Sequence, residues 1–473
     1  MNESLAIVIL AAGKGTRMGG KSAKVLVESF TGPLIHQVLS TALKLTPSRI
    51  SVVVGFQGDR VQESVESWLK EKGDPCKVSF CTQKEQKGTG DAVRAALPSL
   101  ENFTGEVLIL CGDAPLIEVG SLQKLLKDHH EKKATVSVLS ALLPEPGSYG
   151  RIIRDRETGT LTAITEAKDA SPLELLNHEI NSGVYVVDSA FLPGALSRLE
   201  TDNAQGEYYL TDIVKRATAE GQTVTSVLCG SSEEVLGVNT YADLHLVNSI
   251  LQKRIREDFA LNGVHFIHPD SVVLHPETKI GSSVTIGPST VIGKNVVIGN
   301  GVIIEGLSHI TDTTIDEGAH IKWSCRIDQS TIGENAAVGP FAHIRPGSFL
   351  GKEVKVGNFV ETKKATLHDG AKASHLTYLG DAEIGKDANI GAGTITCNYD
   401  GYSKFKTTIE DGVFIGSNTA LVAPVTIKEG ATIGAGSTIT KDVSAAALAL
   451  TRAEQREIAG WSKKKRQREQ KKK

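Results

Sequence analysis

The sequence predicts an α/β domain with a mostly parallel, Rossmann-like sheet, joined by a long helix to a parallel β-helix of hexapeptide repeats. Three observations support this. Short apolar segments alternate with helical patterns up to about residue 240, a single amphipathic pattern follows, and aliphatic residues then recur at every sixth position. A chain of 473 residues also exceeds one ordinary core. We expect domains at 1–240 and 263–452, a helical linker at 241–262 and a basic, disordered tail at 453–473.

The first half alternates apolar strands with helices. The strand candidates are "AIVIL", "ISVVVGF", "KVSFC", "EVLILCG", "TVSVLSALL" and "GVYVV". Helical spacing is found between them at 33–45, 58–72, 89–100 and 119–132. This alternation predicts a mostly parallel sheet with helices on both faces. Ligands of such sheets bind beyond the carboxyl ends of the strands, where "LAAGKGTRM" and "CGDAP" lie.

Residues 241–261 read as one amphipathic helix between the two halves. Leu244, Val247, Leu251 and Ile255 recur three or four residues apart and so fall on one stripe. We expect this helix to link the two domains.

The second half has a period of six. The recurring aliphatic residues are Ile280, Ile286, Ile292, Ile298, Ile304 and Ile310, then Ile332, Val338, Ile344, Leu350 and Val356, then Ile415, Leu421, Ile427, Ile433 and Ile439. A helix has a period of 3.6 and a strand a period of 2, so neither explains sixes. A hexapeptide β-helix does, because each unit adds a short strand and a turn to a triangular prism with a continuous core.

Composition restricts the class of protein. The net charge is −3, but the last eleven residues hold eight cations and one Glu, so the remainder is acidic, at about −10. The acidic charge argues against nucleic-acid binding by the chain before the tail, and the tail itself is expected to be solvated. The six cysteines form no CxxC pair or zinc spacing, which favours reduced thiols in a cytoplasmic protein. No apolar run approaches the length of a membrane span, so we expect no membrane insertion.

The segment "LAAGKGTRM", residues 10–18, follows the first predicted strand and is typical of a phosphate-binding loop. It is not a Walker loop, because no Gly-Lys-Ser/Thr closes it. It also departs from the dinucleotide fingerprint, since Met18 stands where the third glycine belongs. A plain strand–helix turn remains the alternative.

Asp113 follows the strand "VLILCG" at the ligand-bearing edge of the predicted sheet. A carboxylate there suits Mg²⁺, which takes oxygen ligands and bridges phosphates. The alternative is that Asp113 caps the helix after Pro115.

Several separate strings resemble one family. They are "LAAGKGTRM", "QKGTGDAV", "CGDAPL", "YGRI", "EINSGVYV", "RPGSFL", "VGNFVETKKA", "HLTYLGDAEIG", "NIGAGTITCNYDG" and "GSNTALVAPV". Together they resemble the bacterial bifunctional N-acetylglucosamine-1-phosphate uridyltransferases (UDP-N-acetylglucosamine pyrophosphorylases) that are also glucosamine-1-phosphate N-acetyltransferases. The resemblance covers nearly the whole chain. It implies a nucleotidyltransferase domain, a left-handed β-helix and a homotrimer whose acetyl-CoA grooves lie between neighbouring β-helices.

The resemblance implies that the first domain transfers UMP from UTP to N-acetylglucosamine 1-phosphate and releases pyrophosphate. Because the attacking phosphate is already ionised, the site needs alignment and charge neutralisation, which we assign to backbone N–H groups with Arg17 and Lys24. The metal ligands for Mg²⁺ are then Asp113 and Asn239. The resemblance places Leu10, Gly13, Gln83, Gly88 and Thr89 around the uridine, and Gly150, Glu166 and Asn181 around the amino sugar. The other implied substrate-binding residues are Ala11, Ala12, Lys24, Cys111, Gly112, Asp113 and Asn239. Where the family commonly has Pro before the lysine, this chain has Ala23, which predicts a less stiff loop.

The second domain is implied to acetylate glucosamine 1-phosphate with acetyl-CoA. An amine is mostly protonated at pH 7, so a general base is required, and His375 in "HLTYLGDAEIG" is the candidate. Direct attack on the thioester needs no covalent nucleophile. By resemblance, Arg345 and Lys363 bind the sugar phosphate, and Tyr378 and Asn389 orient the sugar. The implied acetyl-CoA residues are Ala392, Asn398, Tyr399, Ser417, Ala435 and Arg452.

Three functions fit this pattern. The first is the two-site enzyme, which would supply cell-wall and lipopolysaccharide precursors. The second is a single-activity sugar-phosphate nucleotidyltransferase with a structural β-helix, and the third is a non-catalytic scaffold. The second should lack His375 and the string "GAGTITCNYDG", and the third should have lost Arg17, Lys24 and Asp113. The string and all four residues are present, which favours the first.

Overall fold

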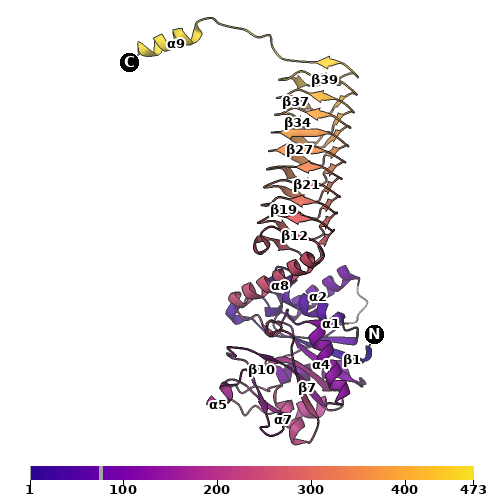
Figure 1. Cartoon of the computed structure of the whole chain (residues 1–473), viewed down its shortest axis with the longest axis vertical. Coiled ribbons are helices and arrows are strands. Elements are labelled where there is room, and N and C mark those ends of the chain that lie inside the picture. The colour runs from indigo at the N-terminus through magenta and orange to yellow at the C-terminus, as the bar shows by residue number, and fades with distance from the viewer. Residues whose placement is uncertain (1, 74–77, 473) are drawn as a thin grey trace. The chain divides into compact units, whose positions relative to one another are not determined.

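The computed structural model describes residues 2–73 and 78–472 and divides the chain into two compact units, Met1–Leu251 and Gln252–Lys473 (Figure 1). Cys76 lies outside the described residues. The boundary between the units falls inside α8 (Tyr241–Leu261), the helix that the sequence predicts as a linker. Among the described residues, no helix combines the length and apolar character of a membrane span.

One mixed sheet forms the centre of the first unit. In spatial order its strands are β11 (Val224–Leu228), β7 (Val136–Leu142), β10 (Glu179–Asp188), β6 (Glu106–Cys111), β1 (Asn2–Ala11), β4 (Pro47–Val54) and β5 (Val78–Thr82). Successive residues of β1 alternate between two buried clusters: Ile7 and Ile9 belong to one, Ala6 and Val8 to the other. Because alternate side chains point to opposite faces, both faces of the sheet are covered.

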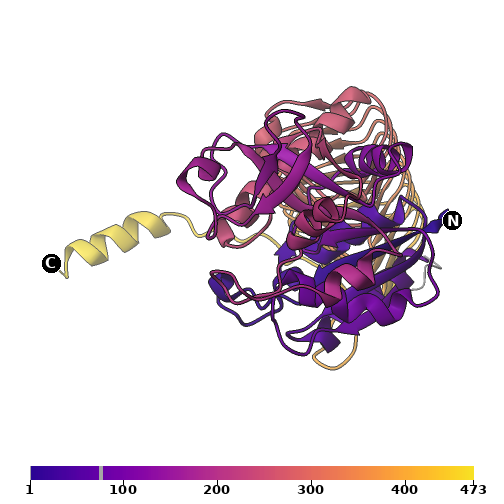
Figure 2. The same cartoon turned by 90° about the horizontal axis from the view of Figure 1, so that it is seen from below.

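The predicted helices are confirmed, and they cover both faces of the sheet (Figure 2). On one face lie α1 (Leu34–Leu43), α2 (Gly58–Lys72) and α4 (Val119–Glu131), whose apolar residues join the first cluster. On the other lie α3 (Thr89–Ala96), α6 (Leu192–Ser197) and α7 (Asp212–Ala219), whose apolar residues join the second. The carboxyl ends of β1 and β6 lie at the same edge of the sheet, with Leu10 opposite Cys111 in the parallel register.

Three parts of this sheet do not follow from the apolar pattern. β10 runs antiparallel to both β6 and β7. A hairpin of β8 (Arg151–Arg154) and β9 (Leu161–Thr165) branches from β10, and β11 forms the edge beside β7.

The second unit is a prism of three parallel sheets stacked coil upon coil. The sheets run from β12 (His265–Phe266) to β41 (Leu448–Ala449), from β13 (Val273–Leu274) to β40 (Thr438–Ile439), and from β14 (Lys279–Ile280) to β38 (Val425–Ile427). Ile286 pairs with Ile304 one coil away, and Ile304 with Ile321. The aliphatic residues of the six-residue repeat lie in or against one continuous core, so the predicted β-helix is confirmed.

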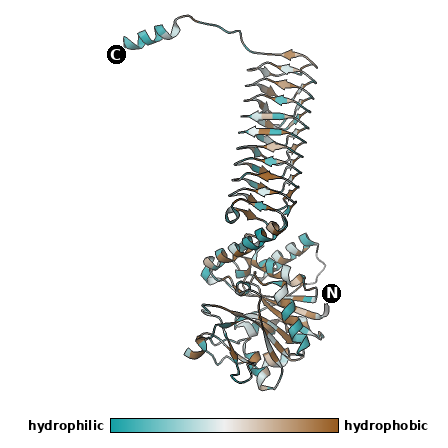
Figure 3. Ribbon diagram, viewed as in Figure 1, coloured by the Kyte–Doolittle hydropathy of each residue, from teal (hydrophilic) through white to brown (hydrophobic). Residues whose placement is uncertain are grey.

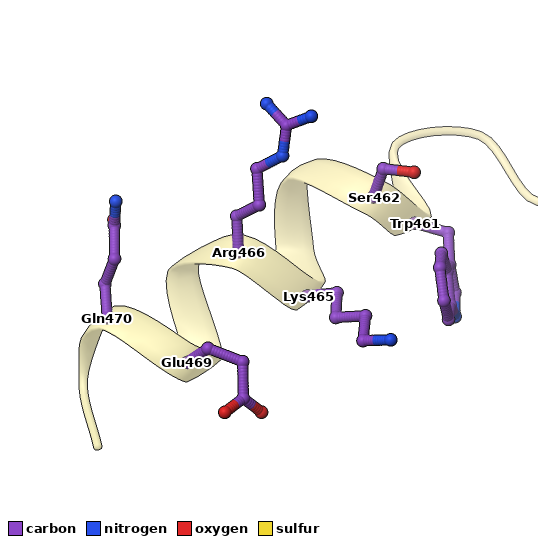
Figure 4. Close-up of a pocket in the computed structure, with 6 residues that line it drawn as sticks. All are labelled: Trp461, Ser462, Lys465, Arg466, Glu469 and Gln470. Carbon is purple, nitrogen blue, oxygen red and sulfur yellow. The ribbon is translucent and has the colours of Figure 1, made fainter. Parts of the chain in front are cut away.

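The tail beyond the β-helix contains a helix, α9 (Trp461–Gln470), where the sequence predicts disorder. Its residues are all exposed and mostly hydrophilic (Figure 3). Figure 4 shows a hollow on α9 whose lining side chains all come from this one helix and point in different directions. Such a hollow has no second wall, and we do not count it as a binding site.

Candidate functional sites

The glycine-rich loop brings Lys24 back to the edge where β1 ends. The Lys24 backbone N–H donates to the Gly13 carbonyl (3.1 Å), which folds the loop onto its own start. Gly15 has φ of 64°, and a Cβ there would lie 3.3 Å from the Lys24 Cα. The left-handed conformation and the close approach explain glycine at this position. Arg17 lies on a short 3-10 helix, Thr16–Met18, with an exposed side chain.

Lys24, Asp113 and Asn239 meet at this edge of the sheet. The Lys24 ammonium donates to the Asp113 carboxylate and, at 2.8 Å, to the Asn239 amide oxygen. Asp113 does not cap α4, whose N-cap is Glu118, so the capping alternative is wrong. The two predicted metal ligands therefore present a carboxylate and an amide oxygen to one cationic group, and these are ligands that Mg²⁺ accepts. Among the described residues, no cluster of three His, Cys, Asp or Glu side chains could hold a metal.

The start of α8 fixes the position of Asn239. The Asp243 carboxylate accepts from the backbone N–H groups of Asn239 (2.9 Å) and Thr240 (2.8 Å). The Asp243 N–H in turn donates to the Thr240 hydroxyl (3.2 Å), which completes a capping arrangement at the helix start. The helix that follows the first domain thus holds one side of its candidate site.

Gln57 ties down the loop segment in front of Lys24. Its side-chain oxygen accepts from the Ala23 N–H (3.0 Å), and its side-chain nitrogen donates to the Lys21 carbonyl (3.0 Å). Proline has no N–H and could not make the first bond. The expectation of a less stiff loop at Ala23 therefore needs correction, because the side chain of Gln57 restrains the segment.

The residues predicted around the uridine form the neighbouring wall. The buried Gln83 side chain donates to the Gly88 carbonyl (3.1 Å) and to Asp91 (2.9 Å), and Gln86 donates to the Ala12 carbonyl. A Cβ on Gly88 would lie 2.6 Å from the Tyr208 carbonyl oxygen. The Thr89 hydroxyl accepts from the Leu210 N–H (3.0 Å). Ala11, like Ala12, is buried.

Cys111 and Gly112 complete the floor between the two strand ends. Gly112 donates to the Leu10 carbonyl (2.9 Å), and a Cβ there would lie 2.9 Å from the same oxygen. Burial, with a smaller contribution from Asp113, raises the pKa of the Cys111 thiol to about 12. Cys111 is therefore a neutral thiol at physiological pH and is unsuited to be a nucleophile.

Gly150, Glu166 and Asn181 lie together on the β8–β9–β10 side. Asn181 donates its N–H to the Gly150 carbonyl (2.9 Å), and a Cβ on Gly150 would lie 3.6 Å from a Glu166 carboxylate oxygen. Burial raises the pKa of Glu166, while a hydrogen bond from Thr211 opposes that shift. The structure thus gathers all three residues predicted for the amino sugar.

In the β-helix, His375 belongs to a column of residues at one corner of the prism. It ends β30 (Lys372–His375) and pairs with Asn358 at the end of β27 (Lys355–Asn358). The next coils place Ala392, Ser417 and Ala435 at the equivalent position, each two residues past a paired isoleucine. The predicted base is thus aligned with three predicted acetyl-CoA residues. His375, Ser417 and Ala435 are exposed.

The adjacent sheet carries the predicted phosphate ligands. Arg345 donates its backbone N–H to the Thr362 carbonyl (2.9 Å), which places its side chain one coil from Lys363. The Arg345 guanidinium pairs with Glu361 (2.7 Å), whose strand neighbour is Tyr378. The Lys404 ammonium lowers the pKa of Lys363, and desolvation and Arg345 lower it further. Three cations therefore lie close together, and Lys404 is one that the sequence did not predict.

The remaining predicted residues lie on the insertion after β34 (Ile395–Cys397) and near the end of the prism. The Asn398 side chain is buried and donates to Asp381, whereas Tyr399 is exposed and donates to the Gly401 carbonyl (2.6 Å). Arg452 donates to the Ala435 carbonyl (3.1 Å), so it joins the column of His375. Asn389 lies on β33 (Asn389–Ile390), paired with Lys372 at the start of the strand that carries His375.

Sequence comparisons match both units. Residues 6–238 match the family described as nucleotidyl transferase, 268–368 the GMPPB C-terminal domain, and 406–441 the bacterial transferase hexapeptide (six repeats). A protein of Trichlorobacter lovleyi is 44% identical over 98% of this chain and 98% of its own length. One of Pelobacter propionicus is 44% identical over 97% and 98%, and one of Geotalea uraniireducens 44% over 98% and 100%. Each is named bifunctional protein GlmU.

The chain belongs to the GlmU family. The full-length matches confirm the resemblance inferred from the motifs, and they favour the two-enzyme interpretation over a nucleotidyltransferase with a purely structural β-helix. Both units are therefore enzymatic, a nucleotidyltransferase followed by a hexapeptide acetyltransferase.

Proposed function

We propose that this GlmU-family chain acetylates glucosamine 1-phosphate with acetyl-CoA and then transfers UMP from UTP to the product, giving UDP-N-acetylglucosamine and pyrophosphate. Its product would supply cell-wall and lipopolysaccharide synthesis. The observation that carries the proposal is that each set of predicted residues gathers within one unit. Lys24, Asp113 and Asn239 meet in the first unit, and His375 aligns with the acetyl-CoA residues in the second.

In the first unit, the residues fit a site that neutralises a triphosphate. The Lys24 ammonium already lies between two oxygen ligands, and Arg17 adds a second cation on the same loop. Asp113 and Asn239 would hold Mg²⁺, which when bound neutralises phosphate charge. Lys24 then binds a phosphate oxygen, and the loop N–H groups fix the alignment of the attacking phosphate.

In the second unit, the residues fit proton removal from an amine next to an anion. His375 is exposed at the corner of the prism and takes a proton from the amino group as that group attacks the thioester carbonyl. Arg345, Lys363 and Lys404 bind the sugar phosphate, while Tyr378 and Asn389 orient the sugar. The thiolate of coenzyme A leaves as the amide forms.

We also propose a homotrimer, supported by an apolar edge on the β-helix. This edge consists of Leu307, Trp323, Phe341, Phe359 and Leu376, which are 40% to 62% exposed. The rings of Phe341 and Phe359 stack with centroids 5.3 Å apart, and both residues have φ near 55°. Large side chains seldom adopt that conformation, and a contiguous exposed apolar edge usually marks an interface. Leu376 follows His375, so the interface would border the acetyltransfer site.

The free thiols of the five described cysteines support a reducing compartment, and we propose the cytoplasm. Two assays test the function: loss of the acetyl-CoA thioester with glucosamine 1-phosphate, and pyrophosphate release from UTP with N-acetylglucosamine 1-phosphate and Mg²⁺. We expect the purified chain to catalyse both. Absence of the first activity, with the second intact, would leave only the single-activity nucleotidyltransferase.

A further inference from the structure

Asn358 is the residue directly below His375 in the corner column of the β-helix. The two are partners in the parallel register of β27 and β30, at the last position of each strand. Paired residues of neighbouring parallel strands point to the same side, and adjacent strands lie about 4.8 Å apart. The amide of Asn358 and the imidazole of His375 are therefore side by side on one face.

Asn358 and His375 each have a side-chain hydrogen-bonding group without a partner among the described residues. The Oδ1 atom of Asn358 is buried and has no hydrogen-bond partner within the described part of the chain. A buried carbonyl oxygen without a hydrogen bond destabilises the folded state, because it has lost its bonds to water. Of the ring nitrogens of His375, neither forms a hydrogen bond to another described residue, so one N–H remains available.

The surrounding groups offer few other donors to Asn358. The coil below places Pro340, which has no N–H, at the equivalent position of the column. The Leu376 N–H already donates to the Asn358 backbone carbonyl (2.9 Å), and the Thr377 hydroxyl donates to the His375 carbonyl (2.7 Å). The backbone is packed closely here, since a Cβ on Gly357 would lie 2.0 Å from the Ser374 oxygen.

We propose that Asn358 is a positioning residue for His375: its Oδ1 accepts the N–H of one imidazole nitrogen and leaves the other free as the base. The partner of one ring nitrogen determines which tautomer a histidine adopts. This bond fixes both the tautomer and the ring orientation, and it persists when the other nitrogen takes the proton from the amine. The inference rests on the proposed acetyltransfer at His375.

The test compares Asn358→Leu, which removes the acceptor at similar volume, with Asn358→Asp, which keeps it. We expect Asn358→Leu to lower kcat of acetyl transfer about tenfold, the value of one hydrogen bond, with KM for both substrates unchanged. Asn358→Asp should restore kcat to within about threefold of the wild type. Lys355→Leu, an exposed change on the same strand, is the matched control and should leave kcat unaltered. Pyrophosphate release and thermal unfolding are followed in every variant.

The double variant separates positioning from a general structural effect. In an His375→Ala background, Asn358→Leu should lower the residual acetyl transfer no further, because the group it orients is gone. Equal kcat in wild type and Asn358→Leu would overturn the inference, as would the same tenfold loss in both backgrounds. If Asn358→Leu does not fold, Asn358→Ala, which also removes the acceptor, takes its place with the same expectations. A wild-type chain without acetyltransferase activity would instead refute the proposed function.

Discussion

Lys24 donates a 2.8 Å hydrogen bond to Asn239, a residue 215 positions later in the chain. The same ammonium contacts Asp113, so one cation joins a loop after β1, a loop after β6 and the segment before α8. Asn239 is itself held by the cap of α8 through Asp243. The site of the first unit thus depends on the start of the helix that leads out of it.

Asp113→Asn should abolish most uridyl transfer and leave acetyl transfer intact. The substitution keeps the size of the side chain but removes the charge that faces Lys24 and the proposed metal. Loss of a preorganised charge at a reaction centre costs at least about a hundredfold in kcat. Pyrophosphate release and thioester consumption, measured on the same preparation, check this. A parallel loss of both activities would contradict separate sites.

His375→Ala should give the reverse pattern. Removal of a general base lowers kcat of acetyl transfer by about 10²–10⁴-fold. Uridyl transfer should be unchanged, because the residues proposed for it belong to the first unit and His375 to the second. The remaining acetyl transfer should rise at high pH, where more of the amine is already deprotonated. An acetyltransferase that is unaffected by His375→Ala would assign the base to another residue.

The period of the sequence determined much of the fold. Six-residue spacing has few physical solutions, so Ile286, Ile304 and their equivalents predicted a β-helix core that the structure contains. The stripe of Leu244, Val247, Leu251 and Ile255 likewise predicted a helix, and α8 spans Tyr241–Leu261. The direction of each strand was harder to predict from the sequence. β10 is buried on both faces like the strands of the same sheet that run parallel to one another, so its apolar pattern carries no sign that it runs antiparallel.

Site residues that lie in local motifs could be predicted from the sequence. Residues that reach a site only through tertiary contacts could not. Asp113 and His375 lie in strings that resemble the family, and the resemblance also implies Asn239, although the roles of all three residues remain predictions. Gln57 and Lys404 carry no such signal. Gln57 matters because α2 begins beside the Lys24 loop, and Lys404 because an insertion after β34 brings it to Lys363. Neither proximity can be read from sequence spacing.

Gln57→Ala should weaken uridyl transfer by loosening the loop that carries Lys24. It removes two hydrogen bonds to the backbone, each worth about 1 kcal/mol, so we expect kcat/KM to fall about tenfold. Ala23→Pro should largely rescue this variant, because Ala23 has φ of −56°, which proline adopts without strain. Steady-state kinetics of the single and double variants measure the effect. No rescue by proline would mean that Gln57 acts other than by restraining the loop.

Acid should destabilise the first unit through His129. This side chain is buried, and its Nδ1 lies 2.8 Å from the Ser137 hydroxyl. Burial lowers the pKa of His129 from 6.5 to about 4. Because the folded pKa lies below the unfolded value, the stabilisation is complete above pH 6.5 and is lost as pH falls toward 4. Between pH 7.5 and pH 5 the loss should reach about 2 kcal/mol.

The control for this pH effect is His129→Gln, which keeps hydrogen-bonding groups but does not titrate. Between pH 7.5 and pH 5 its free energy of unfolding should fall by about 2 kcal/mol less than that of the wild type. Chemical denaturation of the full chain, followed with a probe in the first unit, provides the measurement. Equal pH profiles for the two proteins would exclude His129 as the source.

Lys404→Met should impair binding of the sugar phosphate more than the chemistry of acetyl transfer. Lys404 lowers the pKa of Lys363, which means that the two ammonium groups repel each other until an anion binds between them. Removing one cation relieves that repulsion but also removes a phosphate ligand. We expect KM for glucosamine 1-phosphate to rise roughly tenfold with kcat little changed, and the salt dependence of KM to weaken. The matched control is Lys406→Met, since Lys406 pairs with Glu383. An equal rise in KM for both variants would attribute the effect to general surface charge and exclude Lys404 as a phosphate ligand.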